Sequence, residues 1–317
     1  MILTTLLPIT LGIALIWISA EKLERYSVVA AKDFGMSPFF IGSTIIAFGT
    51  SAPEMLTTFF AGLDNKGSMI IGNVIGSNVA NLSLVFGTTL FIIALKKQTI
   101  LQNISIIPNL GILLAATLLM WFFIATNPFS LSTSAVLLLA LIAVITFWYK
   151  TNSTDLQENT EASSERFVFL KLIGSLLLLV FSAWLITKGA MNLLNRLNLG
   201  ELFVGYTILA IGTSLPEIAA ASSLAIKGRY ETVAGTLIGS NIFNGLCVLA
   251  IPGLMNRPEM SMGWNYADWS SLLLILFAIT VVFTAYIYQL TKEPKKANLI
   301  LGIIFLSTYF ISLAFAY

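Results

Sequence analysis

A six-residue motif occurs twice in this chain, and it constrains the fold more than any other feature. The first copy is G-T-S-A-P-E at residues 49–54, and the second is G-T-S-L-P-E at residues 212–217, a shift of 163 residues. The same shift superposes G-S-N at 76–78 on G-S-N at 239–241 without a gap. The chain is therefore built from two related halves. Each half carries a carboxylate, two hydroxyls, a glycine and a proline inside an apolar segment.

The composition fits a chain that lies within a membrane. Of 317 residues, 57% are apolar and 10% are charged, whereas a soluble domain has about 25% charged residues. Apolar runs of about 18 to 25 residues recur, and each is long enough to cross a hydrocarbon core of about 30 Å. The runs are continuous, unlike the short alternating segments of a barrel. The small net charge of +2 gives no support for nucleic-acid binding. We predict an all-α polytopic membrane protein.

Ten transmembrane helices are predicted, five in each half. The first half, residues 1–149, has a repeat core (α-repeat 1) at 42–87, and the second half, 167–317, has α-repeat 2 at 205–250; residues 150–166 form a polar linker. Because five is odd, the second half must enter the membrane from the opposite side. This inverted-topology repeat is typical of secondary transporters. The predicted helices cover residues 2–25, 37–62, 68–95, 103–125, 130–149, 167–190, 201–226, 232–254, 267–290 and 297–316.

Basic residues predict the orientation of these helices. The odd-numbered connections hold 13 Lys and Arg residues and the even-numbered ones hold 4, and cytoplasmic connections are the richer in these residues. Both termini are therefore expected outside, with the linker at 150–166 in the cytoplasm. Trp148, Tyr149 and Trp269 stand near predicted helix ends. We expect them in the interfacial belts, where aromatic residues are enriched.

Each motif places a glutamate at membrane depth. A charged side chain there is costly, so an intramembrane carboxylate is read as functional by default. Pro53 and Pro216 each remove a backbone donor, which leaves the carbonyl oxygen four residues earlier without its helical partner. Backbone oxygens around 47–49 and 210–212 can then turn toward a cation.

The residue types select hard cations. The chain has no His and one Cys, Cys247, so the usual ligands of zinc, copper and iron are missing. Oxygen ligands suit Na⁺, K⁺, Ca²⁺ or Mg²⁺, and Ca²⁺ takes six to eight of them. Glu54 and Glu217 together offer up to four, and each shares a helix face with a threonine, Thr50 or Thr213, four residues before it. Two carboxylates balance one Ca²⁺ or two Na⁺, so one pocket can hold either in turn.

At these residues the chain resembles the sodium/calcium exchanger family of the cation/Ca²⁺ exchanger superfamily, prokaryotic type. The family pattern is G-[TS]-S-x-P-[ED] on one helix and G-S-x-x-x-[ND] on the next, found here at 49–54 with 76–81 and at 212–217 with 239–244. The resemblance implies that predicted helices 2, 3, 7 and 8 form an ion core, across which helices 1 and 6 slide during alternating access. The cation ligands that it implies are Ala47, Thr50, Ser51, Glu54, Ser77, Asn81, Ala210, Thr213, Ser214, Glu217, Ser240 and Asn244.

The function implied by the resemblance is electrogenic exchange of Na⁺ for Ca²⁺ across a prokaryotic inner or plasma membrane. It implies a secondary antiporter rather than an enzyme, with no cofactor and no obligate protein partner. Two positions depart from the family pattern: Thr236 stands where the first half has Asn73, and Asn244 replaces an Asp of several relatives. The second departure leaves the formal charge of the site at −2 and weakens the case for K⁺ co-transport.

Other functions share some of these features. Exchange of Ca²⁺ for H⁺ on the same fold is the main alternative, because a buried pair of glutamates can trade one Ca²⁺ for protons. An ion channel would use similar ligands but needs a continuous pore. An intramembrane hydrolase would need a Ser–His or paired-Asp arrangement; the chain has no His, and its four Asp residues lie in or near the predicted connections.

Overall fold

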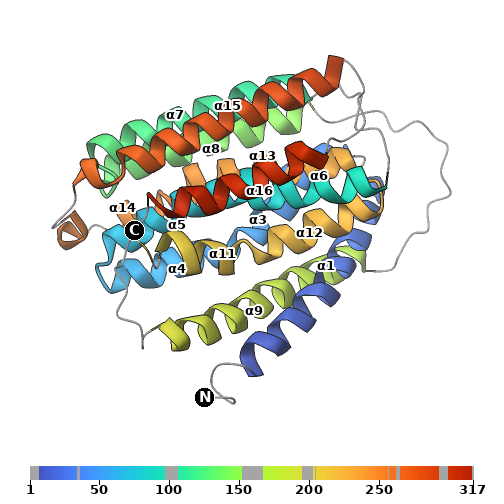
Figure 1. Ribbon diagram of the computed structural model, residues 1–317, viewed down its shortest axis with the longest axis horizontal. Coiled ribbons are helices and arrows are strands. Elements are labelled where there is room, and N and C mark those ends of the chain that lie inside the picture. Colours follow the sequence, from blue (N-terminus) through green and yellow to red (C-terminus); the bar gives the residue numbers. More distant parts are fainter. Residues whose placement is uncertain are drawn as a thin grey trace.

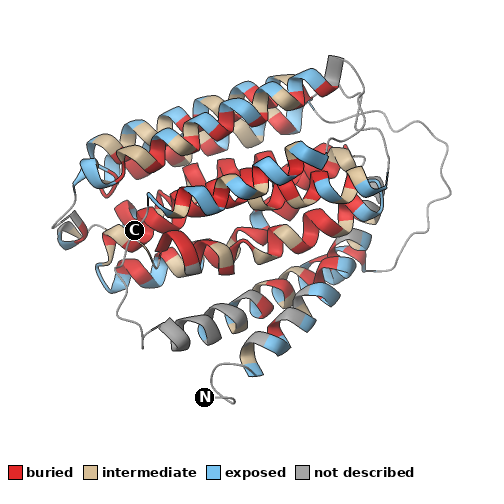
Figure 2. Ribbon diagram, in the orientation of Figure 1, coloured by how far each residue is buried: buried red, intermediate tan, exposed pale blue. Residues whose placement is uncertain are grey.

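The computed structural model describes residues 7–33, 36–96, 106–151, 167–194, 203, 205–255, 257–261, 265–292 and 299–315. These residues are helical apart from short turns and a single bridge residue, Met36. The helices lie in three layers that share one general direction (Figure 1). The central layer carries both motifs, and the buried residues concentrate there (Figure 2).

One outer layer consists of two long helices, α1 (Leu7–Asp33) and α9 (Val168–Leu194), which pack side by side. The predicted end of the first helix at residue 25 is wrong, because α1 continues for eight more residues to Asp33. The prediction ended the helix too early because charged residues follow the apolar run. Leu23, Ser27 and Ala30 are buried at helical spacing, while Glu21, Lys22 and Arg25 are exposed, so one face of the helix remains packed.

The central layer holds the helices predicted over 37–62, 68–95 and 232–254 as single spans, and the one predicted over 201–226 as a bent pair. Each is divided into shorter α- and π-helical segments. The first half contributes α2 (Pro38–Ile41), η2 (Gly42–Ile46), α3 (Ala47–Thr50), α4 (Ala52–Leu63), α5 (Gly67–Ala80), η3 (Asn81–Val85) and α6 (Phe86–Leu95). The second half contributes η5 (Gly205–Leu209), α11 (Ala210–Thr213), α12 (Leu215–Ile226), α13 (Tyr230–Phe243), η6 (Asn244–Val248) and α14 (Ile251–Leu254). Every boundary from residue 42 to residue 85 returns 163 residues later.

Glycines let the two halves interlock in this layer. A Cβ atom at Gly42 would lie 2.4 Å from the carbonyl oxygen of Thr232, and one at Gly205 would lie 2.5 Å from that of Met69. These two contacts are equivalent under the 163-residue shift. Each half therefore presses a glycine of its motif-bearing segment against the next helix of the other half, at a distance that excludes any side chain.

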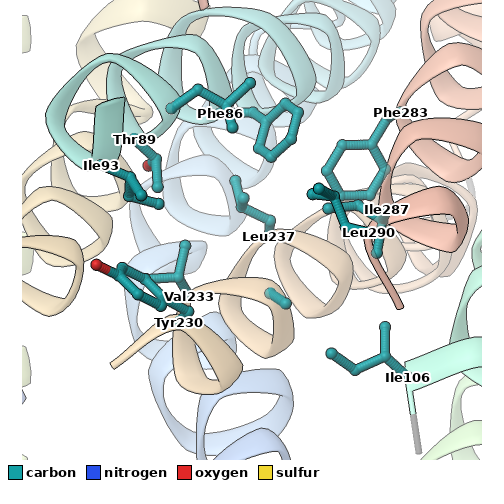
Figure 3. A pocket seen from close by; sticks show the side chains of 12 residues that line it. Phe86, Thr89, Ile93, Ile106, Tyr230, Val233, Leu237, Phe283, Ile287 and Leu290 are labelled. Carbon is teal, nitrogen blue, oxygen red and sulfur yellow. The ribbon is translucent and has the colours of Figure 1, made fainter. Parts of the chain in front are cut away.

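The other outer layer holds α7 (Ile107–Thr126), α8 (Leu131–Thr151) and α15 (Ser270–Lys292), while α16 (Leu299–Leu313) packs on α6 (Figure 1). Two short 3₁₀ turns, η7 (Pro258–Ser261) and η8 (Tyr266–Asp268), precede α15. A small apolar cavity of about 30 Å³ lies between α6, α13 and α15, with Phe86, Leu237 and Phe283 on its walls (Figure 3).

Aromatic residues near the helix ends are placed in two ways. Tyr149 is exposed, as expected of an interfacial residue, but Trp148 and Trp269 are fully buried, so the prediction for these two is wrong. The indole N–H of Trp148 donates to Asn109 Oδ1 at 2.8 Å, and its ring packs edge-on against Phe39. The indole N–H of Trp148 therefore has an acceptor inside the protein, in place of the water or lipid headgroup expected at the membrane interface.

The outer surface of the helices carries many apolar side chains, as expected of a surface that faces membrane lipid. Large apolar side chains such as Leu139, Leu170 and Ile300 are about two-thirds exposed. Among the described residues, six helices are long and apolar enough to cross a membrane; the pair η5–α11 and α12, bent by 43°, makes a seventh when counted as one span. All ten predicted ranges contain a helix, but a count of ten spans and their inverted topology stay predictions. The six are Pro38–Leu63, Gly67–Leu95, Ile107–Thr126, Leu131–Thr151, Tyr230–Leu254 and Ser270–Leu290.

Two cations cap helix ends across the halves. Arg257 Nη1 donates to the carbonyl oxygen of Leu63, the last residue of α4, at 2.7 Å. Lys96 Nζ donates to that of Ile226, the last residue of α12. Leu63 and Ile226 are equivalent under the repeat, and in both cases the cation comes from the opposite half. Basic groups at a helix C-terminus satisfy its unpaired carbonyls and oppose its negative dipole end.

Candidate ion-binding site

Each motif breaks its helix at a serine and restarts it just before the glutamate. Ser51 (φ −82°, ψ 2°) and Ser214 (φ −82°, ψ 0°) separate α3 from α4 and α11 from α12. Proline occupies the second position of each new helix, where its missing N–H costs little. Glu54 and Glu217 consequently lie in the first turn of α4 and α12, and the positive end of the helix dipole favours a carboxylate there.

The two carboxylates are buried together in the central layer. Glu54 is 0% exposed and Glu217 is 1% exposed, and two ionised carboxylates that share one buried site repel each other. Ser51 Oγ donates to Glu217 Oε1 at 3.4 Å, and Thr50 Oγ1 lies 3.3 Å from Ser240 Oγ. Both contacts join the two halves. The site is therefore shared between the halves, and its two carboxylates require a counter-charge, supplied by a bound cation or by protons.

Unpartnered oxygen atoms gather around these carboxylates. Buried polar groups in proteins nearly always have a hydrogen-bond partner. In the part of the chain that the structure describes, no partner is found for either carboxylate oxygen of Glu54, for Glu217 Oε2, or for the side-chain polar atoms of Ser77, Asn81 and Asn244. Ser214 Oγ is also unpartnered. A set of buried oxygens without donors is suited to coordinate a desolvated hard cation.

Two of the backbone oxygens predicted to turn toward a cation, those of Ala47 and Ala210, still take part in helical bonds. The carbonyl oxygen of Ala47 accepts from the N–H of Ser51 at 3.0 Å and from Thr50 Oγ1 at 3.3 Å. That of Ala210 accepts from the N–H of Ser214 at 3.0 Å. Thr213 Oγ1 donates to the carbonyl oxygen of Leu209 at 2.8 Å. A cation would therefore compete with these bonds, or use the second lone pair of each oxygen.

All of the predicted ligand residues lie in the buried centre of the fold, and none is more than 1% exposed. They come from four adjoining pieces of the central layer: α3–α4, α5–η3, α11–α12 and α13–η6. Among the described residues, no group of three or more Asp, Glu, Cys or His side chains is placed to hold a metal. A cation here would depend on two carboxylates and on neutral oxygens. The cavity of Figure 3 is lined by apolar side chains and contains neither glutamate.

Sequence reasoning missed the π-helical turns in the central layer. The turns η2, η3, η5 and η6 begin at Gly42, Asn81, Gly205 and Asn244. Such turns are rare and are frequent at functional sites. A π-turn and an α-turn have nearly the same apolar pattern, so periodicity could not separate them. The available signal was an asparagine at the same place in both halves, within an otherwise apolar run.

Two polar residues next to the site were not among the predicted ligands: the sequence singled out Asn73 only as a position where the halves differ, and Thr58 was missed. Thr58 on α4 and Asn73 on α5 are 0% and 1% exposed, and their side-chain polar atoms have no partner among the described residues. Neither belongs to the repeated ligand pattern, because their equivalents in the second half are Ala221 and Thr236. The signal that could have found them is their spacing of four residues from Glu54 and Ser77.

Fold and site together define a helical membrane protein with a buried two-carboxylate centre shared between two halves. The family model described as "Sodium/calcium exchanger protein" matches residues 4–150 and 167–317. The chain therefore belongs to the sodium/calcium exchanger family.

Similar proteins cover nearly the whole chain. The membrane protein MJ0091 of Methanocaldococcus jannaschii is 31% identical, covering 96% of this chain and 95% of its own length. The sodium/calcium exchanger MaX1 of Methanosarcina acetivorans is 24% identical over 90% of this chain and 99% of its own. A solved structure of the sodium-calcium exchanger NCX_Mj, soaked with Na⁺ and Sr²⁺, superposes with a TM-score of 0.80 at 28% identity and covers 99% of both chains.

Proposed function

We propose that this chain is a secondary antiporter that exchanges Na⁺ for Ca²⁺ across the membrane. The observation that carries the proposal is the buried pair Glu54 and Glu217, one from each half, surrounded by hydroxyl and amide oxygens without partners. Two carboxylates balance one Ca²⁺ or two Na⁺, so the site can hold either cargo but not both at full charge. Binding of one cargo therefore favours release of the other.

The proposed ligands are those that the family resemblance implies, and their burial in the central layer supports the proposal. Ca²⁺ would take the two carboxylates with Thr50 and Thr213, while Na⁺ would use the serine hydroxyls and the carbonyl oxygens nearby. Asn81 and Asn244 would contribute their amide oxygens at the centre of the site. The full proposed ligand set is Ala47, Thr50, Ser51, Glu54, Ser77, Asn81, Ala210, Thr213, Ser214, Glu217, Ser240 and Asn244.

Alternating access is the proposed mechanism. The paired helices α1 and α9 pack against the motif-bearing layer from one side. A Cβ atom at Gly49 of the first motif would lie 2.0 Å from Leu176 Cδ2 of α9, so the motif offers α9 a smooth backbone surface. In this proposal the α1–α9 pair slides along that surface and opens the site to one side at a time, within ten helices arranged as two inverted halves, residues 1–149 and 167–317.

The test is ⁴⁵Ca²⁺ uptake into proteoliposomes that contain the purified protein. An outward Na⁺ gradient is expected to drive Ca²⁺ inward. The resemblance to the exchanger family also implies electrogenic exchange, so a potential-sensitive dye should report a membrane potential, which requires that more than two Na⁺ move for each Ca²⁺. A proton gradient alone should drive no uptake. Uptake driven by protons with Na⁺ inert would replace this proposal with Ca²⁺/H⁺ exchange.

The proposed orientation places both termini outside and residues 150–166 in the cytoplasm of a prokaryotic cell. The turn at Asn65, which is exposed, should then face outward. The test uses Asn65→Cys in a Cys247→Ser background, so that the new thiol is the sole one. A membrane-impermeant maleimide should label it in intact cells. Protection in intact cells with labelling only after lysis would reverse the orientation.

A further inference from the structure

Buried polar atoms without partners extend beyond the proposed ligand set, and two residues of the first half carry such atoms one helical turn from Glu54 and Ser77. Thr58 Oγ1 and both polar atoms of the Asn73 side chain have no hydrogen-bond partner among the described residues, although these residues are 0% and 1% exposed. Many threonines of the chain instead donate to a carbonyl of their own helix, as Thr117 does to Leu113 at 2.9 Å. Thr58 lies within α4 and has such carbonyls nearby, yet its hydroxyl donates to none of them.

The two residues lie at one level of the helix pair. Thr58 stands four residues after Glu54 on α4, and Asn73 stands four residues before Ser77 on α5. The two helices pack together, run in opposite directions and are joined by the turn at 64–66. Four residues advance a helix by about 6 Å. Thr58 and Asn73 therefore form a second pair of polar residues. This pair lies one helical turn from the level of Glu54 and Ser77, toward the connection at 64–66.

The second half has no equivalent pair of unpartnered polar side chains. Ala221 occupies the place of Thr58 and brings no polar atom. Thr236 occupies the place of Asn73, and its hydroxyl already donates to the carbonyl oxygen of Thr232 at 2.9 Å. The backbones of the two helix pairs have identical boundaries, so the difference lies only in side-chain chemistry.

We propose that Thr58 and Asn73 form an accessory Na⁺ site adjacent to Glu54. The site would use Thr58 Oγ1, Asn73 Oδ1 and one oxygen of Glu54. One carboxylate with neutral oxygens matches a monovalent cation and leaves a divalent one undercompensated. The inference rests on the proposed function and adds to it a second Na⁺-binding position on one side of the main site. Na⁺ that approaches from the side of the 64–66 turn is held one helical turn before the main site, and Na⁺ from the other side is not.

The experiment measures Na⁺-dependent ⁴⁵Ca²⁺ flux in oriented proteoliposomes while Na⁺ is varied on one side at a time. Thr58→Val and Asn73→Leu each remove an oxygen ligand, and each is expected to raise the half-saturating Na⁺ concentration about fivefold on the side of the 64–66 turn. The value on the opposite side should not change. Thr58→Ser keeps the hydroxyl and should behave as the wild type. Thr236→Val is the matched control, because its hydroxyl is bound to its own helix.

A second readout separates a Na⁺ site from a structural role. Ca²⁺/Ca²⁺ exchange without Na⁺ should proceed at the wild-type rate in Thr58→Val and Asn73→Leu, because neither residue belongs to the proposed Ca²⁺ shell. An equal loss of Ca²⁺/Ca²⁺ exchange would overturn the accessory site and make the two residues supports for Glu54. Unchanged Na⁺ dependence in both variants would also overturn it while leaving the proposed function intact. Absence of Na⁺-driven flux in the wild type would overturn both.

Discussion

The first and second halves share a backbone but differ in how their polar groups are satisfied. Segment boundaries agree residue for residue across the repeat cores. Ser51 of the first motif nevertheless donates to Glu217 Oε1 at 3.4 Å, whereas Oγ of its equivalent, Ser214, has no hydrogen-bond partner among the described residues. The duplicated sequence thus specifies duplicated geometry, and single substitutions such as Ala221 for Thr58 give each half its own chemistry. A symmetric fold therefore carries an asymmetric site.

The strongest test of this comparison replaces each glutamate separately. Glu54→Gln and Glu217→Gln should each lower Ca²⁺ flux by about 100-fold or more, because one remaining carboxylate cannot balance a desolvated divalent ion. The measurement is Na⁺-driven ⁴⁵Ca²⁺ uptake, with monodispersity by size-exclusion chromatography as the check on folding. Glu21→Gln, at an exposed position on α1, should retain full activity. Normal transport by either variant would show that one half suffices.

A second comparison concerns the glycines that join the halves. A Cβ atom at Gly76 would lie 2.7 Å from the carbonyl oxygen of Tyr206, and one at Gly239 would lie 2.4 Å from that of Ser43. Gly76→Ala and Gly239→Ala should therefore each destabilise the protein by about 1–3 kcal/mol, seen as a lower apparent Tm in detergent. The matched control is Gly111→Ala, where no atom lies within 4 Å. A control as damaging as the two variants would refute the steric explanation.

The mildest expected effect comes from Asn244→Asp, which makes the centre of the second half unlike that of the first. Asp adds a titratable carboxyl group to the buried site where the wild type has a neutral amide that cannot titrate. At low pH the protonated Asp is neutral like Asn, so the flux of the variant should approach that of the wild type. At higher pH its charge should retain Ca²⁺ and slow turnover. Superimposable pH profiles would remove position 244 from the ion site, and a K⁺ requirement in the wild type would contradict the −2 site.

Much of the fold follows from the spacing of residues along the chain. Apolar runs predict the helices, and the glycines shared by both halves, such as Gly42 and Gly205, fall where the halves touch. Local helix geometry does not follow in the same way. The π-turns that begin at Asn81 and Asn244 depend on packing between helices. The apolar pattern along the sequence carries no information about that packing.

The candidate site shows the same division. The twelve residues proposed as ligands are those implied by the family resemblance that the motifs carry, and all are buried. Thr58 and Asn73 could not be chosen in this way, because polar residues without a repeated partner are usually packing residues in membrane helices. Trp148 was misplaced for a related reason: its partner Asn109 lies 39 positions away, and a sequence pattern does not indicate which distant amide an indole will meet.

The crossed helix caps bear on biosynthesis. Translation delivers the first half before Arg257 exists, so the end of α4 at Leu63 must wait for a residue 194 positions later in the chain. Lys96, by contrast, is already synthesised when Ile226 emerges, 130 positions further on. A nascent chain that carries the first half alone thus lacks the partner for one of its own helices. The native arrangement is completed only after the second half has entered the membrane, and premature termination leaves the carbonyl oxygen of Leu63 without this donor.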